Sequence, residues 1–234
     1  MSEVGTIEPV SVWALVPVKS PIWAKTRLAS RLSQRERALL QWAMLKDVLD
    51  QLKTVPRLTG IAIVCPDASI QAMAKAQGIR VFGNEPKPGG LNSALRYGTE
   101  SLREAGADLV AILPGDVPLL CAVDIDNAIM QAIEENATVV VPDHYREGTN
   151  ALIFWADRAP RFAFGKNSFR RHLHDPKNAP VCTIDLPSVA HDVDWPNDLD
   201  ALSGKLSQGV APCTSFAVAR CTRVRTPALM EDLK

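Results

Sequence analysis

Short apolar runs alternate with amphipathic stretches along the first half of the chain. The first run, residues 12–18, is continuously apolar, as in a strand covered on both faces. A polar loop over 19–31 follows it. Ser33 and Glu36 then match a capping box, in which the serine side chain accepts from the third helical amide and the glutamate reaches back. The pattern therefore predicts the order strand, loop, helix.

The same order recurs further along the chain. We expect strands at 61–64, 79–82 and 109–113, and helices at 69–77, 91–104 and 123–135. Repeated units of this kind favour a mostly parallel sheet with helices on both faces. Three later apolar stretches lie too close together for regular crossover helices, at 138–141, 151–154 and 181–184. The prediction is therefore an α/β protein with a mixed, mostly parallel sheet.

The regular pattern fades near Leu206. We place one domain at residues 10–206 and a partly disordered tail at 207–234. A length of 234 residues suits one α/β domain of this kind. The chain holds no apolar run near the ~20 residues that span a bilayer, and its start lacks a signal-peptide pattern. These features predict a cytoplasmic protein.

Charge and cysteine usage narrow the choice of partners. Lys plus Arg and Asp plus Glu both total 26, so no net charge favours nucleic acid or an anionic membrane as partner. The five cysteines are scattered and form no C-x-x-C pair. We therefore expect reduced thiols and no zinc site.

The loop after the first predicted strand carries three cations. In open α/β sheets ligands bind beyond the carboxyl ends of the strands, where Lys19, Lys25 and Arg27 could neutralise a polyphosphate. A solvated basic loop explains them equally well. A Walker phosphate loop is excluded, because Lys19 and Ala24 stand where that motif requires glycine.

Three aspartates follow predicted strands or precede a helix. Asp116 lies in a turn after the apolar strand, and Asp192 and Asp194 share one side of an extended segment before Pro196. Carboxylate oxygens suit a hard cation such as Mg²⁺. Turn formation and helix capping are the simpler alternatives, although capping accounts for one acid of the pair and not for both. Together the three acids predict a magnesium site.

A further pair of segments could bind an anion, at 148–150 and 164–173. Gly165 permits close approach of a backbone, and Ser168 begins a helix whose free amides favour a phosphate or carboxylate. The alternative is a capped helix with a solvated basic face. His172 and His174 are predicted to be surface or capping residues, since no carboxylate or cysteine lies at ligand spacing.

Six segments between Trp13 and Leu206 together resemble the 2-phospho-L-lactate guanylyltransferase family of coenzyme F-420 biosynthesis. In chain order they are V-P-V-K-x-x-x-x-A-K-T-R-L, G-G-L-N-S-A-L, L-P-G-D-V-P-L-L, G-T-N-A-L, F-G-x-x-S-F-x-x-H-L and D-V-D-W-P-N-D-L. The resemblance implies a single Rossmann-like nucleotide-diphospho-sugar transferase fold. It also implies an enzyme that transfers GMP from GTP to a small phospho-acid and releases pyrophosphate.

The same resemblance implies roles for the residues noted above. The phospho-acid, which is 2-phospholactate, phosphoenolpyruvate or 3-phosphoglycerate among family members, would be held by Thr149, Gly165 and Ser168. Mg²⁺ would be held by Asp116, Asp192 and Asp194. The catalytic residues, which act on the charge of the reacting phosphates, would be Lys19, Lys25, Arg27 and Asp116. The guanosine would be lined by Gly89, Gly90, Leu91 and Asn92. A downstream transferase would take the product, and a homodimer is possible.

Two alternatives stay open. A molybdenum-cofactor or sugar-phosphate nucleotidyltransferase usually carries L-x-x-G-x-x-x-R in its first loop, where this chain has Pro-Val-Lys-Ser-Pro. A non-catalytic nucleotide-binding protein would use the three aspartates as structural caps and would release no pyrophosphate.

Overall fold

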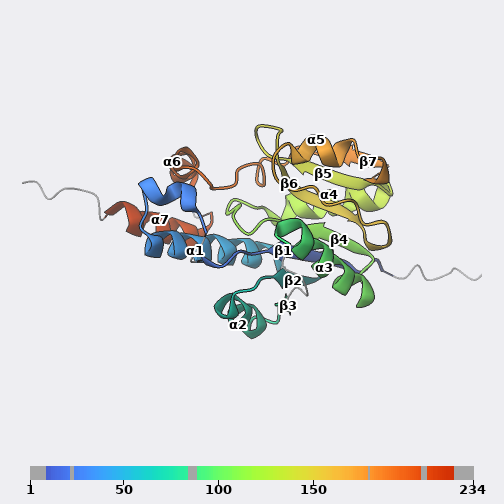
Figure 1. Cartoon of the computed structure of the whole chain (residues 1–234), viewed down its shortest axis with the longest axis horizontal. Coiled ribbons are helices and arrows are strands. Elements are labelled where there is room, and N and C mark those ends of the chain that lie inside the picture. The colour runs from blue at the N-terminus through green and yellow to red at the C-terminus, as the bar shows by residue number, and fades with distance from the viewer. Residues whose placement is uncertain (1–8, 22–23, 84–88, 179, 207–209, 224–234) are drawn as a thin grey trace, which may run out of the picture.

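The computed structural model describes residues 9–21, 24–83, 89–178, 180–206 and 210–223 (Figure 1). Its strands are β1 Val12–Pro17, β2 Leu58–Val64, β3 Arg80–Phe82, β4 Leu109–Ile112, β5 Thr138–Pro142, β6 Thr149–Trp155 and β7 Val181–Thr183. Its α-helices are α1 Gln34–Leu52, α2 Ala68–Ala76, α3 Leu91–Glu104, α4 Ala122–Glu134, α5 Ser168–Leu173, α6 Pro196–Lys205 and α7 Pro212–Arg223. Short 3-10 helices are η2 Thr26–Ser30, η3 Ala156–Arg158 and η4 Pro176–Asn178. None of the described helices has the length and apolar character needed to cross a membrane.

The described strands form one sheet in the order β3-β2-β1-β4-β6-β5-β7. The first four strands along the chain run parallel, β6 runs antiparallel to both of its neighbours, and β7 is parallel to β5. The predicted mixed, mostly parallel sheet is confirmed. Because β6 is reversed, its first residues lie at the same edge as the last residues of β4 and β5.

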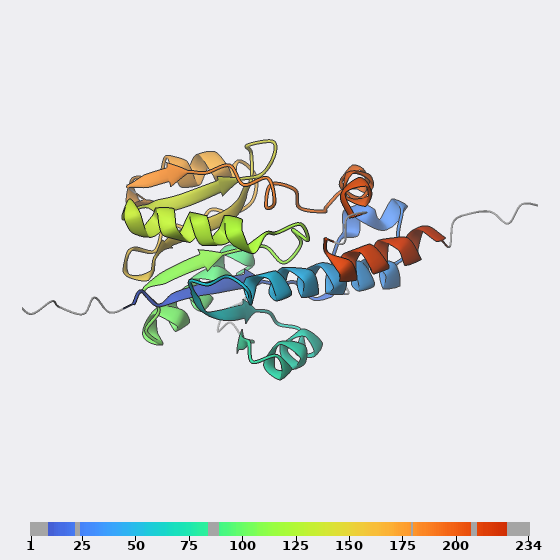
Figure 2. The same ribbon diagram turned by 180° about the vertical axis from the view of Figure 1, so that it is seen from behind.

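Side chains of the strands alternate between two apolar layers, as the pleat of a strand requires. On one side, residues such as Ile63 pack with Leu49 of α1 and Ile129 of α4. On the other side, residues such as Phe154 pack with Leu95 of α3. Helices therefore cover both faces of the sheet, as the sequence predicts. Figures 1 and 2 show the molecule from opposite sides.

Helix α1 begins at the predicted capping box. The Ser33 hydroxyl accepts from the Glu36 amide at 3.3 Å, and the Glu36 carboxylate accepts from the Ser33 amide at 2.7 Å. The helix has 19 residues and its first half extends beyond the sheet (Figure 2). There its apolar side chains join η2, α6 and α7 in a third core, which includes Leu28, Met44 and Val218.

Helix α7 lies in the segment for which a partly disordered tail is expected. It packs along α1 (Figure 2), and its Cys213 and Thr214 amides donate to the buried Asp47 carboxylate at 3.1 and 2.7 Å. A carboxylate at a helix start accepts the free amides of the first turn. Residues 212–223 of the predicted tail therefore form a helix that packs on α1. Residues 207–209 and 224–234 lie outside the described residues, and the domain boundary at 206 stays a prediction.

Candidate active site

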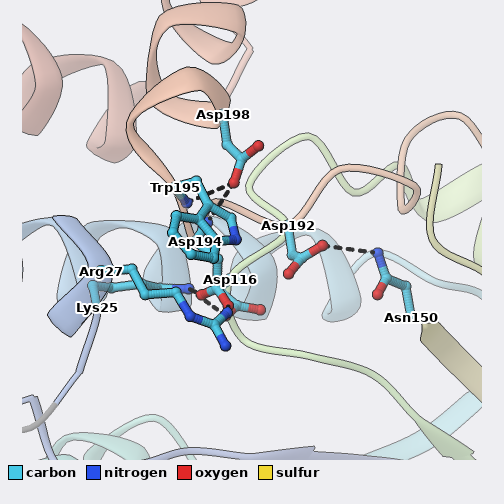
Figure 3. Close-up of polar contacts among 8 residues, drawn as sticks. All are labelled: Lys25, Arg27, Asp116, Asn150, Asp192, Asp194, Trp195 and Asp198. Atoms are coloured by element: carbon cyan, nitrogen blue, oxygen red, sulfur yellow. Dashed lines mark hydrogen bonds and ion pairs between the residues drawn. The ribbon is translucent and has the colours of Figure 1, made fainter. Parts of the chain in front are cut away.

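The loop after β4 and the segment before α6 meet at the carboxyl edge of the sheet (Figure 3). Asp116 lies in the first of these segments, and Asp192 and Asp194 lie in the second. The backbone amide of Val193 donates to the Asp116 carbonyl at 3.2 Å, which holds the two segments together. The structure thus places the three predicted aspartates in one cluster.

Lys25 lies between two of these acids. Its Nζ is 2.5 Å from Asp116 Oδ2 and 2.9 Å from Asp194 Oδ1, and its side chain is 3% exposed. Burial alone would lower the pKa of Lys25, but the two carboxylates outweigh it and raise that pKa above its ordinary value. Its φ of 53° is a left-handed conformation that is uncommon for a residue other than glycine. The ammonium is therefore a fixed charge at the centre of the cluster.

Arg27 and Lys19 approach the same cluster from solvent. The Arg27 guanidinium lies 2.8 Å from Asp194 Oδ2 and stacks over the Trp195 ring at 4.9 Å. Burial raises the pKa of Asp194, but Lys25, Arg27 and Lys19 together lower it below its ordinary value. All three predicted cations of the first loop thus act on one acid of the site.

Asp192 has different surroundings from the other two acids. Its Oδ1 lies 3.5 Å from Nδ2 of Asn150, whose amide also donates to the Val189 carbonyl at 2.8 Å. Burial, together with the negative charges of Asp116 and Asp194, raises the pKa of Asp192 to about 6. The negative potential of the neighbouring acids, which opposes ionisation of Asp192, also favours a bound cation there.

The donor chemistry of the three carboxylates fits Mg²⁺, which prefers oxygen ligands. Within the described residues, however, no three acidic, histidine or cysteine side chains are arranged to ligate one ion as they stand. The Lys25 ammonium bridges Asp116 and Asp194, and Asp192 faces Asn150 instead (Figure 3). Binding one ion between the acids therefore requires these side chains to rearrange.

The residues predicted to hold a phospho-acid lie on β6, at the start of α5 and in the loop that precedes α5. Thr149 is the first residue of β6, so the reversal of this strand places it at the edge that also carries Asp116. Gly165 has a φ of +116°, and its carbonyl accepts from the Ser168 amide at 3.1 Å. Ser168 is buried at the start of α5. Asn150 follows Thr149 and connects this strand to Asp192.

The segment Gly89-Gly90-Leu91-Asn92 forms the start of α3, and its first three residues are exposed. Gly90 precedes the helix with a φ of 77°, a backbone conformation that favours glycine. The Asn92 amide instead binds the backbone of Phe164, donating to its carbonyl at 3.1 Å and accepting from its amide at 2.8 Å. Asn92 thereby connects the predicted guanosine segment to the loop that carries Gly165.

His172 is fully buried, so its prediction as a surface or capping residue is wrong. Its Nδ1 lies 2.9 Å from the Thr149 hydroxyl, and its Nε2 accepts from the Ala163 amide at 3.0 Å. Burial lowers the pKa of His172 to about 4. The sequence did contain a signal, because Phe169 and His172 lie three positions apart on one helical face and Phe169 belongs to the core.

The sheet order, and an edge that combines acids with cations, define a nucleotidyltransferase-type α/β protein, and solved structures share this fold. One, from Desulfovibrio desulfuricans G20 and assigned as a nucleotide-diphospho-sugar transferase, has a TM-score of 0.72 and 17% identity, covering 92% of this chain and 96% of the other. The 4-diphosphocytidyl-2C-methyl-D-erythritol synthase of Anaerococcus prevotii has a TM-score of 0.57 and 12% identity, covering 86% and 100%. These comparisons establish the fold.

The chain belongs to the guanylyl transferase family described as CofC like, whose family model matches residues 12–204. A phosphoenolpyruvate guanylyltransferase of Sphaerobacter thermophilus is 33% identical over 85% of this chain and 95% of its own length. A 3-phospho-D-glycerate guanylyltransferase of Phenylobacterium zucineum is 33% identical over 94% and 96%. The family resemblance inferred from the motifs, and the assignment as a nucleotidyltransferase, are therefore confirmed.

Proposed function

We propose that this protein transfers GMP from GTP to the phosphate of a three-carbon phospho-acid and releases pyrophosphate. The observation that carries the proposal is the Lys25–Asp116–Asp194 cluster, which lies at the same edge of the sheet as Thr149. Family membership and the names of the two relatives support the choice of GTP and of a phospho-acid.

The reaction joins two anions, and its chemistry explains the residues at this edge. A phosphate oxygen of the acceptor attacks the α-phosphorus of GTP, and the bond from that phosphorus to the bridging oxygen breaks to release pyrophosphate. The acceptor is already anionic, so it requires no general base. The protein must instead align the reactants and reduce their repulsion. Lys25, Arg27 and Lys19 supply positive charge for this purpose.

Mg²⁺ is proposed as the cofactor, held by Asp116, Asp192 and Asp194. When bound, it would supply positive charge that stabilises the phosphates. A pKa of about 6 leaves Asp192 largely ionised at neutral pH, as a metal ligand must be. Lys25 keeps Asp116 and Asp194 close together while their charges repel each other.

The two substrates are assigned to separate segments. Thr149, Gly165 and Ser168 are proposed to hold the phospho-acid, and Gly89, Gly90, Leu91 and Asn92 to line the guanosine. The contact of Asn92 with the Phe164 backbone supports close placement of the two substrates. A homodimer, and a downstream transferase that consumes the product, stay predictions.

The proposal is tested by measuring pyrophosphate release with each nucleoside triphosphate and each of 2-phospholactate, phosphoenolpyruvate and 3-phosphoglycerate, with Mg²⁺ and with EDTA. We expect release only when GTP, Mg²⁺ and one of these acids are present together. A preference for CTP, or for a sugar phosphate as acceptor, would support the rival nucleotidyltransferase. GTP binding without pyrophosphate release in any combination would indicate a non-catalytic nucleotide-binding protein.

A further inference from the structure

The hydrogen bonds of His172 identify which of its ring nitrogens carries the proton. The Ala163 backbone amide donates to Nε2 at 3.0 Å, so Nε2 is the acceptor and holds no hydrogen. A neutral imidazole then carries its hydrogen on Nδ1. Since Nδ1 lies 2.9 Å from Thr149 Oγ1, the imidazole donates and the threonine oxygen accepts.

This direction matters for the threonine hydroxyl. A hydroxyl has one hydrogen to donate, and in the opposite arrangement that hydrogen would be directed to the histidine ring. When the imidazole donates, the hydrogen of the Thr149 hydroxyl can be donated to another acceptor. We propose that His172 is a positioning residue that accepts from Ala163 and donates to Thr149, so that the Thr149 hydroxyl donates to the phospho-acid anion. This inference rests on the proposed function, which places the phospho-acid at Thr149.

The surroundings of His172 keep the ring in this form. The residue is fully buried, its carbonyl accepts from the Asn178 side chain at 2.6 Å, and the Phe164 ring meets the imidazole edge-on at 4.8 Å. Burial, aided by the positive charge of Arg171 and opposed by Asp175, lowers its pKa to about 4. An imidazolium would carry a hydrogen on both nitrogens. Its Nε2–H would then point at the Ala163 N–H, which is also a donor. The neutral ring is therefore the form that these contacts accommodate.

The arrangement also connects His172 to the other substrate segment. Ala163 precedes Phe164, whose backbone binds the Asn92 amide at the start of α3. The two hydrogen bonds of Asn92 hold the loop, the loop amide orients the imidazole, and the imidazole orients the hydroxyl. His172 thus acts on the acceptor through Thr149 and has no contact with the three aspartates in the described structure.

The first test compares His172→Phe with His172→Asn. Phenylalanine retains the ring shape without hydrogen bonds, and we expect the KM for the phospho-acid to rise about ten- to hundredfold, as for one lost hydrogen bond to a charged group. The KM for GTP should stay near the wild-type value. Asparagine places an amide N–H near the position of Nδ1, and it should restore most of the acceptor KM.

A double-variant cycle separates positioning from a structural effect. Thr149→Val should raise the acceptor KM by a similar factor, and adding His172→Phe to it should cause little further change, because both act through one hydroxyl. A purely structural role would raise both KM values and make the two effects additive. Either of those results would overturn the inference.

Nitrogen-15 NMR of the imidazole tests the proton position without turnover. The signals of His172, assigned by their absence in His172→Asn, should show a neutral ring protonated at Nδ1 from pH 6 to 9. A ring protonated at Nε2, or charged at pH 7, would overturn the inference. Wild-type turnover with an unchanged acceptor KM in His172→Phe would overturn this inference alone. Absence of pyrophosphate release by the wild-type enzyme in all substrate combinations would overturn the proposed function and this inference together.

Discussion

Lys25 Nζ lies 2.5 Å from Asp116 Oδ2, so a buried ammonium pairs directly with the acid that follows β4. Lys25 belongs to the loop after β1, and β1 and β4 are parallel neighbours in the sheet. The ion pair therefore connects the loops of two adjacent strands at the edge where ligands bind in α/β proteins. It also explains why residues 91 positions apart act together.

Replacing Lys25 should impair both turnover and stability. Lys25→Met leaves Asp116 and Asp194 without their shared cation, and we expect turnover to fall by at least about 100-fold. The free energy of unfolding should fall by roughly 1–3 kcal/mol, less than for a fully buried pair because both acids retain some solvent contact. Pyrophosphate release and urea denaturation measure the two effects.

Arg27→Met is the matched control for stability. Arg27 binds the same Asp194, but its side chain is 55% exposed, so its loss should change the free energy of unfolding by less than about 1 kcal/mol. An equal fall in the free energy of unfolding in the two variants would show that the burial of Lys25 does not add to stability.

Asp116→Asn should abolish measurable turnover while the protein stays folded. The turn at this position is held through the backbone, since the Asp116 carbonyl accepts from the Val193 amide, so the side-chain charge is not needed to form it. Turnover and thermal unfolding are compared with those of Asp200→Asn, whose exposed carboxylate pairs only with Arg31 among the described residues. Wild-type turnover in Asp116→Asn would show that Asp116 serves only to form the turn.

Asp192 should make the metal-free protein less stable as pH rises. Its pKa of about 6 lies above the ordinary value of 3.8, so between these values the folded state binds more protons than the unfolded state. The free energy of unfolding attributable to this group therefore falls as pH rises from about 4 to about 6 and then levels off.

The comparison is with Asp192→Asn, by urea denaturation in EDTA from pH 4 to 8. The two proteins should be equally stable near pH 4, and the variant should be more stable above pH 6. Adding Mg²⁺ at pH 7.5 should narrow this gap, because a ligand stabilises the state that binds it. A stability difference that does not vary with pH would show that Asp192 titrates normally.

Asp47→Ala should destabilise the protein without reducing turnover. The buried carboxylate accepts from two amides at the start of α7, and its loss leaves those donors without their partner, at about 1–3 kcal/mol. Asp50→Ala on the same helix is the control, because the ion pairs of Asp50 among the described residues are with half-exposed lysines. A stability loss of equal size in both variants would contradict the role of Asp47 in holding α7.

Local patterns were sufficient for most elements of the fold. The continuous apolar run of β1 and the capping box at Ser33 depend on neighbouring residues, and both appear in the structure as predicted. The end of β4 likewise places Asp116 at the edge of the sheet where ligands bind, as predicted, and the segment before α6 brings Asp192 and Asp194 to the same edge.

Other features depend on partners distant in the sequence. The burial of Lys25 requires two carboxylates that lie 91 and 169 positions away, and the order of α7 requires Asp47, which lies 166 positions before Cys213. The spacing of Phe169 and His172 on a helix of six residues indicates a shared buried face, but the hydrogen bonds of His172 to Thr149 and Ala163 depend on residues outside that helix. These contacts form only in the folded protein, so they cannot be predicted from the pattern of neighbouring residues in the sequence.

The reversal of β6 places two groups of site residues in different parts of the sheet. The loops after β1 and β4 carry the cations and Asp116, whereas β6, α5 and the loop before α5 supply Thr149, Ser168 and Gly165. The loop that precedes β6, residues 143–148, can therefore change in composition without altering the parallel strands, whereas the loop that follows β6 is bonded to α3 through Asn92 and Phe164. Under natural or laboratory selection, the choice of acceptor acid could diverge in such a scaffold while the handling of the nucleotide is inherited unchanged.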